Sequence, residues 1–174
     1  MSECRVRQLE RDDVEAFVSL RSQGLRSHPL AFGASVEDEA AWTRDVMASM
    51  FNTPERSAVF GAVVNERLVG LIGIRRHGAR KSEHRAFIWG MYVEPDARRK
   101  GVGRRLVSAA IAEARKWPGV LQVQLTVTEA APEARRLYET TGFRVWGREP
   151  RVLCWNGAYT DEYHLVLTLD ESAG

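Results

Sequence analysis

The stretch Arg98-Arg99-Lys100-Gly101-Val102-Gly103-Arg104-Arg105 follows a predicted strand and opens a predicted helix. Five of its eight residues are basic, and none is acidic. Gly101 and Gly103 lack Cβ atoms where backbone has to approach a ligand closely. The first turn of a helix also offers free N–H donors and the positive end of the helix dipole. The stretch therefore favours a polyphosphate site; the alternative is a glycine-bearing helix start with a solvated basic face.

The spacing of this stretch excludes two common phosphate loops. A Walker A loop would end in Gly-Lys-Ser/Thr, which is missing here. The dinucleotide fingerprint would need a further glycine, and only Gly101-x-Gly103 is present. The stretch alone therefore does not identify the class of phosphate site, and the flanking motifs are needed.

Two further motifs flank the loop. An apolar-x-Val-x-Pro strand end precedes it, and a helix motif that ends at Gly142-Phe143 follows it. In these three motifs the chain resembles the GNAT acyltransferase superfamily, and the resemblance in element order extends from Val6 to Leu169. One position departs from the family pattern, because Ala131 stands where the family commonly has an Asn that would cap the helix. The matching residues are Met91-Tyr92-Val93-Glu94-Pro95, Arg98-x-x-Gly101-x-Gly103 and Ala134-x-x-Leu137-Tyr138-x-x-x-Gly142-Phe143.

Hydrophobic periodicity predicts the element order β-α-α-β-β-β-α-β-α-β-β. Asp12 and Glu15 have capping-box spacing at the start of the first helix, and Ser35 and Asp38 have it at the start of the second. The predicted strands are Cys4–Leu9, Ser57–Val64, Leu68–Arg75, His84–Val93, Val120–Thr128, Val145–Trp155 and Tyr163–Leu169. The predicted helices begin at Asp12 and end at His28-Pro29, begin at Ser35 and end at Phe51, and cover Arg98–Arg115 and Pro132–Thr141.

These elements predict one α/β domain over residues 1–174. The strand, crossover helix and strand between Phe87 and Thr128 should form a right-handed parallel unit. Hairpins elsewhere imply antiparallel pairing, so we expect a mixed, mostly antiparallel sheet with a central parallel pair, flanked by helices. The resemblance implies the same GNAT-like fold.

Composition narrows the function classes. The chain has 174 residues, with 25 Lys+Arg against 23 Asp+Glu and a formal net charge of +2. This charge is too small to argue for a nucleic-acid or membrane partner, and DNA binding by Arg98–Arg105 is a minor alternative. We expect a cytoplasmic protein, because no apolar run approaches the ~18 residues that span a bilayer and no segment resembles a signal peptide. We also expect Cys4 and Cys154 to be reduced thiols.

The resemblance implies acetyl-CoA as the cofactor. Backbone groups of Met91 and Val93 would pair with the pantetheine arm like an added strand. Backbone N–H groups from Arg99 through Arg104 would hold the pyrophosphate. The predicted cofactor-binding residues are Met91, Tyr92, Val93, Arg98, Arg99, Lys100, Gly101, Val102, Gly103 and Arg104.

The resemblance also singles out Tyr138 as a catalytic residue. Its phenol would donate a proton to the departing CoA thiolate; the alternative is a helix tyrosine that only packs into the core. The general base is open. Glu83 and His84 begin the strand that leads to the cofactor site, and a water relay from a more distant group is an equal alternative.

The acceptor site should lie between variable segments. Phe32–Glu37 is one expected wall and Tyr159–Tyr163 the other, and Glu37, Asp161 and Glu162 would attract a cationic amine. The four histidines lack close ligand spacing, so we expect no metal. We therefore expect an acetyl-CoA-dependent N-acetyltransferase acting on a primary amine of a small molecule or of a peptide or protein, with a homodimer as its possible assembly. A longer acyl donor or an alcohol acceptor is one alternative, and a catalytically inactive CoA-sensing or protein-interaction domain is the other.

Overall fold

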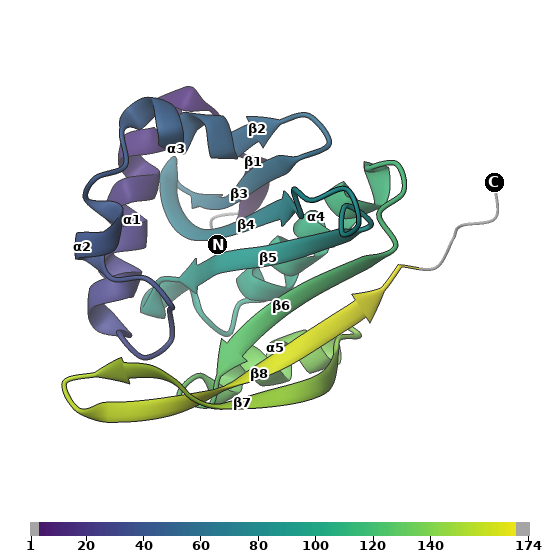
Figure 1. The fold of residues 1–174 in the computed structure, drawn as a ribbon. Helices are drawn as coiled ribbons and strands as arrows, with labels where there is room; N and C mark the ends of the chain where they lie inside the picture. Colours follow the sequence, from purple (N-terminus) through teal and green to yellow (C-terminus); the bar gives the residue numbers. More distant parts are fainter. Residues whose placement is uncertain (1–3, 170–174) are drawn as a thin grey trace.

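The computed structural model describes residues 4–169, and its centre is an eight-stranded sheet. The strands follow the order β1-β3-β4-β5-β6-β8-β7, and the two-residue β2 pairs with β3 beside this path (Figure 1). Only the β5–β6 pairing is parallel among the described strands. This confirms the predicted mixed sheet with a central parallel pair. The strands are β1 (Arg5–Gln8), β2 (Asn52–Thr53), β3 (Ser57–Val64), β4 (Arg67–Arg76), β5 (Arg85–Val93), β6 (Gln122–Thr128), β7 (Arg144–Trp155) and β8 (Ala158–Thr168).

The helices cover the two ends of the sheet unequally. α1 and α3 lie on one face of β3, β4 and β5, and α4 lies on the opposite face. α5 contacts β6 and α4, on the face that α4 covers. No helix within residues 4–169 is both long and apolar enough to cross a bilayer. The helices are α1 (Val14–Ser27), α2 (Val36–Glu39), α3 (Arg44–Phe51), α4 (Val102–Lys116) and α5 (Pro132–Thr140), with 3₁₀ turns at Arg11–Asp13 and Pro95–Ala97.

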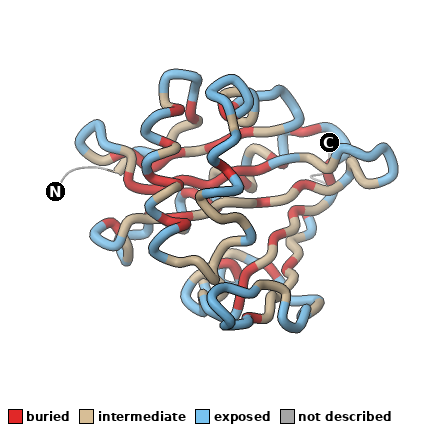
Figure 2. The backbone as a smooth tube through the Cα atoms, turned by 60° about the vertical axis from the view of Figure 1, so that its left-hand side comes forward, coloured by how far each residue is buried: buried red, intermediate tan, exposed pale blue. Residues whose placement is uncertain are grey.

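The sheet separates two apolar cores. Leu71 of β4 packs with Phe17 of α1 and Phe51 of α3, whereas the next residue, Ile72, packs with Leu106 of α4. Buried residues therefore run continuously along the middle of β4 (Figure 2). A continuous apolar strand is expected where both faces of a sheet are covered, and burial of each such side chain contributes roughly 1.5–3 kcal/mol.

The predicted second helix is two helices. α2 ends at Glu39, and α3 begins after Thr43, whose Oγ1 accepts a hydrogen bond from the Val46 N–H at 3.2 Å. A side-chain cap of this kind starts a new helix because it satisfies one of the N–H groups that a helix start leaves free. The predicted Ser35–Asp38 capping box is present at the start of α2, with the Ser35 N–H donating to Asp38 Oδ2 at 2.7 Å.

The cap before α1 lies two residues earlier than predicted. Asp13 Oδ2 accepts a hydrogen bond from the Glu10 N–H at 2.8 Å, so the capping residues are Glu10 and Asp13 instead of Asp12 and Glu15. Asp13 also pairs with both terminal nitrogens of Arg7, each at 2.7 Å. This ion pair fixes the cap at Asp13, because it joins the helix start to β1.

The helix of the basic stretch begins later than predicted. α4 starts at Val102, whereas we expected it at Arg98. Arg99 and Gly101 have φ values of 61° and 75°, which a right-handed helix cannot contain. The basic residues before Val102 therefore form a loop between a 3₁₀ turn and the helix. Two strands also begin at other residues than predicted: β5 begins at Arg85 instead of His84, and β8 begins at Ala158 instead of Tyr163.

Candidate active site

The two central strands separate beside the predicted cofactor site. β5 and β6 pair through Arg85, Ala86 and Phe87 only, and they diverge beyond Phe87 (Figure 1). Past that point one edge of β5 has no neighbouring strand. Within this edge Gly90 has a φ of 67°, and the register against β4 shifts there. Strand edges of this kind carry free backbone N–H and C=O groups that an extended chain can use.

The N-terminus of α4 offers free hydrogen-bond donors next to this edge. The first ladder bond of the helix runs from the Arg105 N–H to the Gly101 carbonyl at 3.1 Å. The N–H groups before Arg105 in this first turn therefore lack intrahelical partners. No side chain caps the helix, and its first turn contains no acidic residue. The positive end of the helix dipole is thus open to an anion.

Gly103 brings three segments of the site together. A Cβ on Gly103 would lie 2.9 Å from Leu137 Cδ2 and 3.0 Å from Met91 Cε. The missing side chain lets the first turn of α4 pack against both β5 and α5. Gly101 differs, because a Cβ there would meet no atom within 4 Å. Gly103 therefore serves close packing, and Gly101 serves the left-handed turn that precedes the helix.

Two basic side chains of the loop before α4 are bound to protein groups. We call the free N–H groups of this loop and of the first turn of α4 the α4 cradle. Arg98 Nε donates to the Val93 carbonyl at 2.9 Å, and its guanidinium lies 5.8 Å from the centre of the Tyr92 ring. Lys100 Nζ donates to the Asp96 carbonyl at 2.8 Å. Arg98 thus fastens the loop to the end of β5, and the cradle consists of backbone groups.

The predicted cofactor residues on β5 lie on two faces of the sheet. Tyr92 is buried under α1, where a Cβ on Gly24 would lie 2.9 Å from its ring. Met91 and Val93 pack toward the core shared with α4 and α5. Only Met91 and Val93 therefore share a face with the α4 loop, whereas the Tyr92 side chain supports α1.

Tyr138 lies on α5, next to the Leu137 that approaches Gly103. It is 5% exposed, and its ring packs edge-to-face on Phe143 with the centroids 5.9 Å apart. Burial raises the pKa of the Tyr138 hydroxyl well above its usual range. Tyr138 therefore stays protonated at neutral pH, as a proton donor must.

Glu83 and His84 lie at the other end of β5. The Glu83 carbonyl accepts a hydrogen bond from Arg76 Nε at 2.6 Å, and the His84 carbonyl accepts one from the Leu121 N–H at 2.8 Å. Both residues stand where β5 and β6 are still together. Nine residues separate His84 from Val93, or roughly 30 Å of extended strand. The structure thus does not bring Glu83 and His84 together with Tyr138 and the α4 loop.

A cavity of ≈ 360 Å³ adjoins one of the two predicted acceptor walls. Residues Phe32–Glu37 all line it, as predicted. The opposite side consists of Leu153, the free cysteine Cys154 and Trp155 of β7, and not of the predicted segment Tyr159–Tyr163. The difference arises from the hairpin, because Cys154 pairs with Tyr159 and stands in front of it.

The carboxylates predicted to attract an amine lie in different surroundings. Glu37 lines the cavity. Asp161 is already bound, since its Oδ2 pairs with Arg148 NH2 at 2.8 Å and its Oδ1 accepts from the Arg151 N–H at 2.8 Å. Glu162 lies in a cluster with Glu149 and His164, whose charged or polar atoms are all within 4.8 Å of one another. Glu37 and Glu162 could thus still attract a cationic amine, as predicted for them.

Glu149 and His164 were not predicted as site residues. His164 Nε2 lies 3.1 Å from Glu149 Oε2. The signal for His164 was present, because Glu162 and His164 alternate with Tyr163 and Leu165 and so point to the opposite face of β8. The contact with Glu149 depends on the β7–β8 register, which contains two shifts that the sequence does not reveal.

A buried ion pair supports the β5 edge from the α1 side. Arg21 donates to Glu39 Oε1 through NH2 at 2.7 Å, and the two residues are 7% and 8% exposed. Arg21 NH1 has no hydrogen-bond partner, and a Cβ on Gly90 would lie 3.2 Å from it. The pair thus joins α1 to α2 directly over the irregular part of β5.

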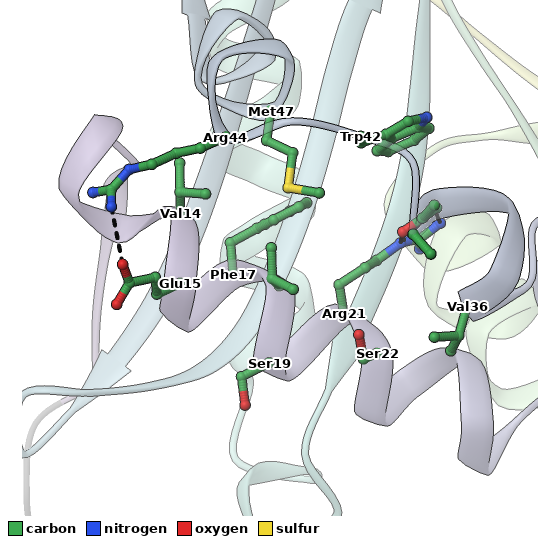
Figure 3. Close-up of a pocket in the computed structure, with 13 residues that line it drawn as sticks. Val14, Glu15, Phe17, Ser19, Arg21, Ser22, Val36, Trp42, Arg44 and Met47 are labelled. Carbon is green, nitrogen blue, oxygen red and sulfur yellow. Dashed lines mark hydrogen bonds and ion pairs between the residues drawn. The ribbon is translucent and has the colours of Figure 1, made fainter.

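A second cavity, of ≈ 580 Å³, lies between α1 and the segment that carries α2 and α3. Figure 3 shows Val14, Phe17 and Arg21 on the side of α1 that faces Met47 and Trp42. An ion pair between Arg44 NH1 and Glu15 Oε1, 2.9 Å long, bridges one end (Figure 3). None of the predicted catalytic or cofactor-binding residues lines this cavity.

Comparison with known proteins identifies the family that this fold and site define. Residues 22–143 match the model of the Acetyltransferase (GNAT) family. The chain belongs to this family of acetyltransferases, whose acyl donor is acetyl-CoA.

Particular relatives agree with this assignment. The chain is 31% identical over 140 residues to a mycothiol acetyltransferase of Thermobispora bispora and 28% identical over 142 residues to one of Brachybacterium faecium. These matches include 77% and 80% of this chain, which spans 44% and 40% of the lengths of the two relatives.

Solved structures show the same fold. A GNAT acetyltransferase of Streptococcus pneumoniae superposes with a TM-score of 0.84 at 20% identity, over 96% of this chain and 100% of that one. The yncA protein of Salmonella typhimurium, solved with acetyl-CoA, superposes with a TM-score of 0.83 at 20% identity, over 98% and 96% of the two chains. At this identity the likeness concerns the fold alone.

Proposed function

We propose that this protein transfers the acetyl group of acetyl-CoA to a primary amine of a small molecule or of a peptide or protein. The observation that carries the proposal is the uncapped N-terminus of α4, which lies beside the free edge of β5. A free strand edge suits the amide-bearing pantetheine arm, and an open helix N-terminus suits a pyrophosphate. The two features adjoin at the contact of Gly103 with Met91.

The residues present fit the donor. Backbone N–H groups of the loop and first turn, from Arg99 to Arg104, would hold the pyrophosphate. Met91 and Val93 would pair with the pantetheine arm through their backbone. Because Arg98 already donates to the Val93 carbonyl, one lone pair of that oxygen is taken. The remaining cradle consists of backbone donors, so glycine geometry matters here more than side-chain charge.

The chemistry is direct attack of the amine on the thioester carbon. A C–N bond forms, the C–S bond breaks, and the amine loses a proton to a base. Tyr138 donates its hydroxyl proton to the thiolate that departs, which its high pKa permits at neutral pH. Glu83 and His84 lie away from this centre, so the amine proton would leave through a water relay.

The acceptor would enter through the cavity between Phe32–Glu37 and the end of β7. Its ≈ 360 Å³ suits a small molecule or the end of a peptide. Glu37 supplies a negative charge for a cationic amine. Because two relatives are named mycothiol acetyltransferases, the amine precursor of mycothiol belongs among the acceptors to be tested.

The cradle is tested by Gly101→Val with Gly157→Val as the matched control. Both glycines have left-handed φ values, 75° and 80°, and a Cβ at either would meet nothing within 4 Å. Each substitution should cost about 1–3 kcal/mol of stability through backbone strain. Only Gly101→Val should weaken CoA binding, by at least about tenfold (~1.4 kcal/mol), because it moves the N–H donors of the α4 loop.

Calorimetric titration with CoA measures this contrast, and thermal unfolding confirms that both variants fold. Equal CoA affinities in the two variants would rule out the α4 cradle. Turnover is tested separately, by CoA release from acetyl-CoA over a panel of primary amines. Tight CoA binding without release for any amine would instead favour a CoA-sensing domain.

A further inference from the structure

We propose that His164, held by Glu149, is the base that receives the proton of the acceptor amine. This inference rests on the proposed function and completes its undetermined step. Within residues 4–169, no helix covers one of the two faces of β8. Tyr163 of β8 contacts α5, since the Arg135 guanidinium lies 4.1 Å from the centre of its ring. His164 therefore projects from the opposite face, as alternation along a strand requires.

The strand register places His164 beside the diverging edge of β5. Phe87 pairs with Gln124 in the parallel β5–β6 ladder, so Thr126 of β6 is level with Trp89, immediately before Gly90. Thr126 in turn pairs with His164 of β8. Residues directly opposite on neighbouring strands share a face. His164 thus stands at the height of the irregular part of β5, across the gap where the two strands separate.

The acceptor cavity adjoins the same face. Thr128 of β6 donates through Oγ1 to the Leu30 carbonyl at 2.7 Å, which ties the segment before Phe32 to the end of β6. Thr128 pairs with Glu162 of β8, two residues from His164. An acceptor held between Phe32–Glu37 and β7 therefore meets the face that carries His164.

The contact with Glu149 prepares the imidazole to accept a proton. Glu149 Oε2 accepts from His164 Nε2–H across 3.1 Å, so Nδ1 carries the lone pair. A carboxylate that accepts from one ring nitrogen in this way fixes the tautomer and the orientation of the ring. The charged groups facing His164 are Glu149 on β7 and Glu162 on β8, and the Trp146 ring lies 5.2 Å away.

The proton travels through water. Neighbouring strands lie about 4.8 Å apart, so β8 is roughly 10 Å from β5 even where the sheet is closed. The ammonium of the acceptor gives one proton to this water relay, and the relay gives one to His164 Nδ1. The free amine then forms the C–N bond, and Tyr138 protonates the thiolate released by C–S cleavage. The second proton, which the nitrogen loses as it becomes an amide, passes through water to Tyr138 and restores its hydroxyl. The imidazolium returns its proton to solvent after each turnover.

The test is the pH profile of kcat/KM for CoA release in His164→Gln, with His77→Gln as the matched control. His77 lies just past β4, against Phe87, and lines neither described cavity. His164→Gln should lower kcat/KM by about 10²-fold near neutral pH, and the deficit should shrink as pH rises, because more of the amine is then already deprotonated. His77→Gln should keep the wild-type profile.

Glu149→Gln tests whether His164 acts as a base or only helps to bind the cationic amine. Glu149→Gln removes the carboxylate that orients the His164 ring, so kcat/KM should fall about tenfold, mainly through kcat. If Glu149→Gln and His164→Gln only raise KM for the amine and leave kcat unchanged, His164 binds the amine and is not its base. If a chelator abolishes wild-type activity, the cluster holds a metal ion and the inference is wrong.

Failure of this inference differs from failure of the proposed function. No CoA release by the wild-type protein with any amine would refute the acetyltransferase proposal. Release by the wild type together with an unchanged profile in His164→Gln would refute only the role of His164.

Discussion

The sheet has two parts on either side of the β5–β6 divergence, a first part of β1 to β5 and a second part of β6, β8 and β7. The helices cover the faces of these two parts differently. In β4, Leu71 packs under α1 and α3 and Ile72 packs under α4, and both side chains are 0% exposed. In β8, Leu165 is also fully buried, but its neighbour His164 projects from the face without a helix. The first part is therefore a platform covered on both faces, and the second has one face without a helix among residues 4–169.

This difference explains where the candidate functional groups gather. The platform holds the free edge of β5 and the α4 cradle in fixed positions through its two cores. The second part contributes Tyr138 from behind, through α5, and His164 from the open face. A reaction that needs a proton donor on one side and a proton acceptor on the other fits this arrangement.

The largest effect should come from Tyr138→Phe, which tests the donor at the back of the second part. The substitution keeps the ring against Phe143 and removes only the hydroxyl, so folding and acetyl-CoA affinity should change little. Turnover should fall by roughly 10²–10⁴-fold, the usual worth of positioned proton transfer. The loss should appear in kcat more than in KM, because the interaction is made mainly in the transition state.

Tyr159→Phe is the matched control for this prediction. Tyr159 is 61% exposed near the tip of the β7–β8 hairpin, and its hydroxyl should be irrelevant to turnover. Stopped assays of CoA release with one good acceptor measure both variants. Full activity in Tyr138→Phe would leave Tyr138 as a packing residue, and the proposal would then stand on the α4 cradle alone.

The next largest effect should be on the free energy of unfolding, and it compares the loss of one ion pair from each part of the sheet. Arg21→Met leaves the Glu39 carboxylate buried without a partner, which should cost about 3–5 kcal/mol of unfolding free energy. Arg148→Met removes a pair with Asp161 in which the arginine side chain is 53% exposed, and it should cost about 0–1 kcal/mol. Urea unfolding at neutral pH measures the two free energies.

A double variant shows whether the buried pair acts through charge or through packing. Arg21→Met combined with Glu39→Met removes both charges, so most of the loss should be recovered. If Arg21→Met costs no more than Arg148→Met, the platform does not depend on the pair. That result would also remove the contrast between a covered and an open part of the sheet.

The sequence predicted the platform well, because its signals are local. The apolar residues around Leu71 indicated a strand, and the basic stretch around Gly101 and Gly103 indicated a helix. The start of that helix was predicted at Arg98, whereas α4 begins at Val102. The break at Thr43 was missed, since Ala40 and Ala41 continue a helical pattern and only the side-chain bond to Val46 shows the new start. Local propensity cannot reveal a cap that competes with a longer helix.

The acceptor face was harder to predict because its contacts are long-range. Glu149 and His164 are 15 residues apart and meet only through the β7–β8 register, which shifts twice. One shift in register moves a side chain to the opposite face of a strand. Of the two predicted walls, Phe32–Glu37 lines the cavity of ≈ 360 Å³ and Tyr159–Tyr163 does not, since the hairpin presents Leu153–Trp155 to it instead. Glu83 and His84 suffered from the reverse problem: they are close to the site in sequence but lie at the far end of β5.

The smallest effect concerns the first strand of the platform, where Arg7 of β1 binds Asp13 at the start of α1. Hydrogen bonds from Arg7, and the bond from the Glu10 N–H, lower the pKa of the Asp13 carboxyl, although its partial burial opposes this. A carboxyl whose pKa is lower in the folded state stabilises the protein above its unfolded pKa of about 3.9. That stability is lost as pH falls through the folded pKa.

Asp13→Asn should therefore cost about 1 kcal/mol near pH 7, and the difference from wild type should shrink below about pH 4. Asp12→Asn removes the same charge from an exposed neighbour and controls for net charge. Urea unfolding at neutral and acidic pH measures both variants. A cost that stays constant down to pH 3 would mean that the Asp13 side chain acts through its shape alone, and that the charge does not help to join β1 to α1.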